Sequence, residues 1–108
     1  MMENRIKTYP EFYRFYLSEH KNKTCRVLHF IGTALVFLIA VIAAYTGISL
    51  YWFLVPLVGY GFAWVGHFYF EKNKPATFKY PLWSLYSDFK MFFQILSGKI
   101  SFDSRKDI

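Results

Sequence analysis

The dominant pattern along the chain is one long apolar block. From Val27 to Phe70 the sequence contains no Asp, Glu, Lys or Arg. That length suits two membrane-spanning helices of about 20 residues each with a tight turn between them. A turn at Gly47 divides the block into a first span over residues 25–47 and a second span over residues 50–70, because glycine commonly ends helices. The pattern therefore predicts a transmembrane helical hairpin.

An amphipathic helix is predicted before the hairpin, over residues 8–20. Thr8 and Glu11 have the spacing of a capping box, and Pro10 falls in the first turn, where its missing N–H costs nothing. The helix carries an aromatic face formed by Phe12, Tyr13, Phe15 and Tyr16. Because that face is too wide for exposure to water, we expect the helix to lie in the membrane interface. Thr24 is then expected to cap the first span.

A second amphipathic helix is predicted after the hairpin, over residues 82–97. Its apolar side chains recur at helical spacing, at Leu82, Leu85, Phe89, Phe92, Phe93 and Leu96. Much of the other face is polar, with Ser84, Ser87, Asp88 and Gln94. The segment is too short and too charged for a third span, so an interfacial position is expected. Gly98 should end the helix, and the tail over residues 99–108 should be frayed.

Composition indicates a membrane protein, and charge predicts which side of the membrane each end of this all-α hairpin faces. We treat residues 1–108 as a single membrane domain. Hydrophobic residues make up 55% and aromatic residues 23% of the chain, more than a soluble domain of this size can bury. The net charge is +6, but the basic residues flank the apolar block, so lipid headgroups rather than nucleic acid are the expected counter-charge. The positive-inside rule then predicts a multi-pass protein with both termini cytoplasmic, in a bacterial inner membrane or the endoplasmic reticulum.

The three histidines are the candidate chemistry. In a hairpin that turns near residue 48, His29 and His67 lie at equal depth, and a short connection brings His20 over the same region. Three imidazoles with open positions suit a catalytic site for Fe(II), Zn(II), Cu or Mn. Glu71 follows His67 by four residues on the same helical face, level with Cys25. It would ligate the metal, orient His67 or pair with a nearby lysine.

The histidines and Cys25 are also compatible with simpler roles. Histidines at a membrane boundary often bind only headgroups or backbone, so the alternative function is a small non-enzymatic membrane protein that packs with itself or a partner. Haem binding between His29 and His67 is a third hypothesis, although one hairpin offers little to enclose a macrocycle. Cys25 is either a soft metal ligand or, more simply, a small buried residue.

Two motifs in the sequence resemble those of a known family, the iron-dependent 2-hydroxy fatty acid dioxygenases. Their N-terminal motif is similar to the segment EFYRFY at residues 11–16, which is followed here by His20, His29 and Gly32. Their signature Gly-His-x-x-Phe-Glu-Lys-x-x-Pro-Ala is similar to GHFYFEKNKPA at residues 66–76. The resemblance covers roughly residues 11–95.

The resemblance implies an activity and a cofactor. The activity is Fe(II)-dependent α-oxidation, in which O2 cleaves a 2-hydroxy fatty acid to an acid one carbon shorter. The family's metal-binding histidines map onto His20, His29 and His67, and Glu71 joins the catalytic candidates. The chemistry is consistent with this, because an α-hydroxy carboxylate can chelate a metal while its acyl chain remains in the bilayer.

Two further expectations concern the surface of the hairpin. Two spans alone enclose no cavity, and the family's longer chains suggest a four-helix core, so we expect a homodimer packed through Gly59 and Gly66. Arg26, Lys72 and Lys74 are most simply positive-inside residues. In an enzyme that acts on a lipid acid, they would also lie where the substrate carboxylate lies.

Overall fold

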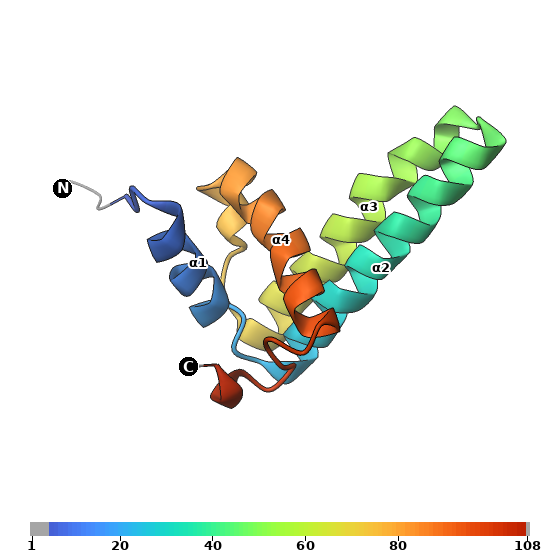
Figure 1. The fold of residues 1–108 in the computed structure, drawn as a ribbon. Coiled ribbons are helices and arrows are strands. Elements are labelled where there is room, and N and C mark those ends of the chain that lie inside the picture. Colours follow the sequence, from blue (N-terminus) through green and yellow to red (C-terminus); the bar gives the residue numbers. More distant parts are fainter. Residues whose placement is uncertain (1–4, 108) are drawn as a thin grey trace.

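The computed structural model describes residues 5–107, and these residues form helices but no strand. Two long helices, α2 (Lys23–Thr46) and α3 (Ser49–Val65), run antiparallel as a hairpin. The shorter helices α1 (Tyr9–Ser18) and α4 (Pro81–Leu96) lie beside the base of this hairpin, at the end away from its turn (Figure 1). The predicted all-helical hairpin with two flanking helices is therefore confirmed.

The hairpin has the length and composition of two membrane spans. α2 has 24 residues and a mean hydropathy of 2.6, whereas α3 and the π-helical segment η1 (Gly66–Glu71) together have 23 residues and a mean hydropathy of 1.3. Only 22% and 17% of their apolar windows are buried, although the core helices of soluble proteins are mostly buried. Gly47 makes the predicted turn with a φ of 70°, in the left-handed region that favours glycine. Insertion into a membrane stays a prediction.

Helix ends differ from the prediction in two places. The side chain of Asn22 accepts hydrogen bonds from the backbone N–H groups of Thr24, at 2.8 Å, and Cys25, at 3.3 Å. Asn22, and not Thr24, is therefore the residue that caps α2. At the start of α1, Thr8 holds the capping position but its side chain makes no capping hydrogen bond, so the predicted capping box does not form.

Two glycines allow α2 and α3 to approach closely. A Cβ atom added at Gly66 would lie 2.9 Å from the sulfur of Cys25, and one added at Gly59 would lie 3.1 Å from a methyl carbon of Val36. Both glycines thus face α2 inside the hairpin. Gly66 is buried within one chain, whereas Gly59 is half-buried, and the predicted homodimer contact through these two glycines stays a prediction. Dimerisation by another surface stays untested.

The aromatic face of α1 is covered by protein. It packs with α4 and the preceding loop in a core formed by Phe12, Tyr13, Tyr16, Ala76, Tyr80 and Met91. The loop contributes a short 3-10 helix, η2 (Ala76–Phe78). The side chains from which an interfacial position was expected for α1 are therefore mostly occupied in internal packing.

α4 has its polar face inward, opposite to the expectation for a helix on an aqueous surface. Ser84 and Ser87 are 1% and 0% exposed, whereas Leu82 and Leu96 are 79% and 62% exposed. The polar groups find partners inside: the Ser87 hydroxyl lies 2.9 Å from that of Tyr9. A helix that turns polar groups to the protein and apolar groups outward has the arrangement usual beside lipid.

The C-terminal tail is docked, not frayed as predicted. Arg26, which is 0% exposed, donates a hydrogen bond of 2.8 Å to the carbonyl of Ser101 and pairs with the carboxylate of Asp107 at 2.5 Å. A short helix, η3 (Ser104–Lys106), precedes Asp107. Ile108 lies outside the described residues. The tail and α1 lie at the same end of the hairpin (Figure 1), and the side of a membrane that they face stays a prediction.

Candidate metal centre

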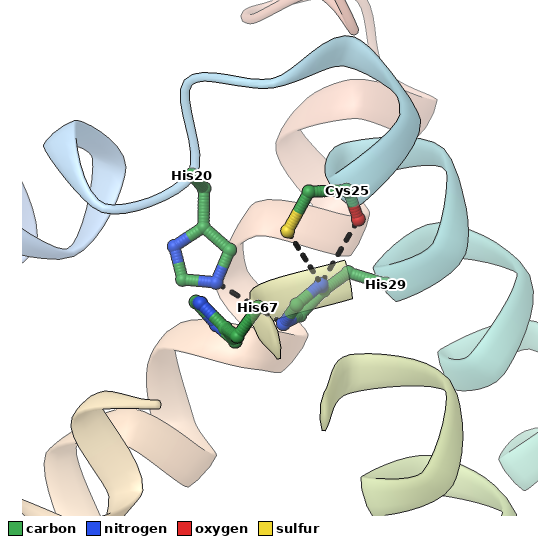
Figure 2. Close-up of side chains that lie close together, drawn as sticks. All are labelled: His20, Cys25, His29 and His67. Carbon is green, nitrogen blue, oxygen red and sulfur yellow. Dashed lines mark hydrogen bonds between the residues drawn. The ribbon is translucent and has the colours of Figure 1, made fainter. Parts of the chain in front are cut away.

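Three imidazoles from separate parts of the chain meet at the base of the hairpin (Figure 2). His20 follows α1, His29 lies on α2 and His67 lies in η1. The ring centroid of His20 is 4.4 Å from those of both other histidines, which are 5.0 Å apart from each other. All three side chains are buried. The structure thus brings together the histidines that the depth argument placed in one region.

The backbone fixes two of these imidazoles through their Nδ1 atoms. Nδ1 of His20 lies 2.6 Å from the carbonyl oxygen of Tyr16, and Nδ1 of His29 lies 3.0 Å from that of Cys25. A carbonyl oxygen only accepts hydrogen bonds, so each Nδ1 must carry the hydrogen. The Nε2 atom of each neutral ring is therefore left with a free lone pair.

Asn73 fixes the third imidazole. Its side-chain oxygen lies 2.6 Å from Nδ1 of His67, and its side-chain nitrogen donates to the carbonyl of Glu19 at 3.1 Å, which sets the orientation of the amide. The chain reaches this position by ending the π-helical segment at Lys72, whose φ is 61°. Sequence reasoning considered Glu71 for this role and missed Asn73, because a π-helical end leaves no trace in a hydrophobic pattern. The one available signal was a polar side chain at a variable position of the motif, between Lys72 and Pro75.

The hydrogen bonds at Nδ1 leave the Nε2 lone pairs of His20 and His29 facing one another. Nε2 of His20 and Nε2 of His29 are 3.1 Å apart, a contact that needs a proton or a cation between the two atoms. A proton there would make one of the two rings an imidazolium. Burial disfavours that charged form, and for His20 burial together with the neighbouring His29 and His67 lowers the pKa well below its usual range. A metal ion satisfies both nitrogens. A void of about 10 Å³ lies among the three imidazoles.

A larger, apolar cavity adjoins the imidazoles. It has a volume of about 230 Å³ and lies between α2, α3 and α4, where the lining includes Val36, Val55, Pro56, Ala63, Leu85 and Phe89. His29 and Asp88 line both this cavity and the small void. Burial raises the pKa of Asp88 to about 7, and the hydrogen bond from the Tyr16 hydroxyl opposes that shift. One chain thus forms a partly open cavity, because α4 supplies a third wall that the two spans alone lack.

Comparison with models of known protein families identifies the family to which the chain belongs. Residues 6–100 match the family model described as Mpo1-like, 2-hydroxy-palmitic acid dioxygenase Mpo1-like. The chain belongs to this Mpo1-like family. Comparisons with curated proteins and with solved structures gave no significant match. The matched range contains all three histidines, the cavity and α4.

In this Mpo1-like chain, Glu71 lies beside the group of side chains that could hold a metal ion and not within it. Potential ligand atoms of His20, Cys25, His29 and His67 all lie within 4.8 Å of one another, and no atom of Glu71 belongs to that set. The Glu71 carboxylate accepts a hydrogen bond of 2.6 Å from the backbone N–H of Asn22. It therefore binds the N-terminal end of α2, where a negative charge is favourable, level with Cys25 as predicted.

Of the predicted carboxylate-binding residues, Arg26 is engaged inside the protein. Its Nε donates a hydrogen bond of 2.5 Å to the carbonyl of His20, while its other nitrogens bind the tail. The guanidinium therefore holds the His20 backbone in place and is not available to a substrate. Lys72 and Lys74 are exposed at the end of η1. The structure leaves their predicted role open.

Proposed function

We propose that this chain is a membrane-embedded, Fe(II)-dependent dioxygenase-like enzyme that shortens 2-hydroxy fatty acids by one carbon through α-oxidation. One observation carries the proposal: Nδ1 contacts hold His20, His29 and His67 with their Nε2 lone pairs free, in a buried group beside an apolar cavity. The name of the family model, 2-hydroxy-palmitic acid dioxygenase Mpo1-like, supports the choice of reaction.

The donor set fits iron. The three Nε2 atoms belong to neutral imidazoles, and a hydrogen bond at Nδ1 orients each ring. Such nitrogens are ligands suited to a divalent transition metal with open coordination positions. His20, His29 and His67 would hold Fe(II), which when bound supplies the redox chemistry and a point of attachment for the oxygens of the hydroxy acid. Cys25 lies near enough to join them. Burial of all three imidazoles keeps bulk water away from the reacting end.

The apolar cavity accounts for the substrate's chain. Its lining, largely aliphatic and aromatic, suits the first part of an acyl chain next to the head group. A volume of about 230 Å³ is below the roughly 300–1,000 Å³ of common ligand pockets, so a long chain would continue past the cavity into lipid. A site at the base of a membrane hairpin would allow the rest of the acyl chain to lie in the bilayer.

A membrane position is supported by the outward apolar surfaces. α2 and α3 are long, apolar and little buried, and α4 turns leucine and aromatic side chains outward beside them. In this proposal α2 and α3 cross the bilayer, α4 contacts lipid along its outer face, and the basic residues at the base of the hairpin face the cytoplasm. Both termini are then cytoplasmic, which tags at the two ends and a probe near Gly47 would test.

The test uses the full chain purified in detergent and supplied with Fe(II). We expect bound iron, together with O2-dependent conversion of 2-hydroxyhexadecanoate to the acid one carbon shorter. His29→Ala should lose both, whereas Gly61→Ala is a matched control in α3, because a Cβ at Gly61 has no neighbour within 4 Å. Iron-free protein that turns over, or iron-loaded protein with an intact fold that does not, would contradict the proposal and favour a non-enzymatic role.

A further inference from the structure

Ser84 presents a buried hydroxyl without a partner. Its side chain is 1% exposed, and among residues 5–107 its Oγ is the one buried side-chain nitrogen or oxygen for which no hydrogen bond is found. Such groups are rare in folded proteins, because a buried polar atom that loses water without gaining a partner is unfavourable. Ser84 lines the small void among the three histidines. Ser84 thus contributes a hydroxyl without a protein partner to the lining of that void.

Asp88 lies one turn further along the same face of α4. It lines the void among the histidines and also the apolar cavity, and it is the one acidic residue in the described lining of either. One of its carboxylate oxygens accepts a hydrogen bond from the Tyr16 hydroxyl. Tyr16 in turn stacks on His20, with ring centroids 4.1 Å apart. Asp88 thus marks the boundary between the polar and the apolar part of the site.

We propose that Ser84 and Asp88 recognise the polar head of the 2-hydroxy acid. Asp88 accepts a hydrogen bond from the 2-hydroxyl group, and Ser84 donates one to a carboxylate oxygen. This inference rests on the proposed function and adds the residues that select the substrate. The hydrogen-bonding groups are complementary. The head group has a hydroxyl donor next to carboxylate acceptors, and α4 has the Asp88 carboxylate as acceptor and the Ser84 hydroxyl as donor beside the histidines.

The pair predicts a preference for hydroxylated acids. An unsubstituted fatty acid has the same carboxylate and chain, so it would satisfy Ser84 and fill the cavity. It has no 2-hydroxyl, so it leaves Asp88 without that partner, and sites built to bind a hydroxyl discriminate strongly against analogues that lack it. The two residues therefore make different predictions: Asp88 sets the preference between the acids, and Ser84 contributes to the binding of both.

Ser87 supplies a matched control on the same helix. It is as buried as Ser84, but its hydroxyl is paired with that of Tyr9 and it lines neither the void nor the apolar cavity. Removing its hydroxyl should change packing in α4 without changing ligand preference. Ser84→Ala removes no hydrogen bond within the protein, and Asp88→Asn keeps the side-chain shape while replacing an acceptor with a donor.

The experiment measures binding of 2-hydroxyhexadecanoate and hexadecanoate to the Fe(II)-loaded full chain by calorimetry without O2. We expect the unmodified chain to prefer the hydroxy acid. Asp88→Asn should reduce that preference about tenfold, the value of one hydrogen bond to a charged group, with little change for hexadecanoate. Ser84→Ala should weaken both acids by a similar factor, and Ser87→Ala should change neither. Iron content should be the same in all four proteins.

Two outcomes would overturn the inference in distinguishable ways. If the unmodified chain prefers and oxidises the hydroxy acid while Asp88→Asn and Ser84→Ala bind both acids unchanged, other groups recognise the head and the proposed function stands. If the iron-loaded chain binds the two acids equally and oxidises neither, the proposed function fails and the inference fails with it.

Discussion

The hairpin and the pair of helices beside it are held together by different means. α2 and α3 meet through close backbone approach, where Gly59 and Gly66 leave room for side chains of the opposite helix. α1 and α4 meet through aromatic packing and directed hydrogen bonds, such as those from Tyr13 to Gln94 and from Tyr16 to Asp88. The first is how helices pack in lipid, where polar contacts are few, and the second resembles the interior of a soluble protein.

The candidate metal centre lies at the junction of these two regions. His29 and His67 belong to the hairpin, whereas His20 arrives with α1, and Arg26 holds the His20 backbone from the hairpin side. Neither region contains the full donor set. The α2–α3 hairpin therefore supplies two histidines and two walls of the apolar cavity, while the α1–α4 region supplies the third histidine and the remaining wall.

The largest expected effect tests whether both regions are needed. His20→Ala should abolish conversion of 2-hydroxyhexadecanoate and greatly lower bound iron, because two imidazoles remain of three. Helix content by circular dichroism should persist, since the hairpin depends on packing and lipid burial, not on the metal. Full activity in His20→Ala would show that the hairpin forms the site alone.

The next effect separates two neighbours of His67. Asn73→Ala should weaken iron binding by about 10- to 100-fold, the usual cost of losing a group that orients a metal ligand. Glu71→Gln should cost less, because Glu71 binds the end of α2 and its amide replacement still accepts from the Asn22 N–H. Competition with a coloured chelator measures both affinities. A larger loss in Glu71→Gln would make Glu71 a direct ligand.

The sequence was enough to predict the hairpin and the convergence of the three histidines, because both depend on the lengths of segments and on the positions of residues along them. The length of the uncharged block predicts two spans, and equal distance from a turn near residue 48 places His29 and His67 at the same depth. The orientation of α4 was not accessible in this way, because its apolar stripe is equally compatible with a core or with lipid outside. Asn73 and the docking of Arg26 on Asp107 depend on local backbone geometry and on contacts between distant residues, which a pattern does not encode.

A smaller effect tests the packing of the hairpin itself. Gly66→Leu should destabilise the protein by about 1–3 kcal/mol, because the new Cβ would lie 2.9 Å from the Cys25 sulfur and 3.3 Å from its Cα. Gly61→Leu has open space and should stay within about 0.5 kcal/mol of the parent. Thermal unfolding in the same detergent compares the two. Equal stability of both variants would mean that the helices do not touch at Gly66.

The smallest expected effect concerns Asn22, the residue that caps the start of α2. Asn22→Ala should cost about 1 kcal/mol of stability, because its side chain accepts from two N–H groups at the start of α2, and those groups would lose their partner. Thr24→Ala should cost less, since Thr24 is already inside the helix and does not cap it. Thermal unfolding of the two single variants and the double variant gives the order. If Thr24→Ala is the more damaging change, α2 begins where the hydrophobic pattern predicted, and the connection that carries His20 toward the hairpin is two residues longer than the structure has it.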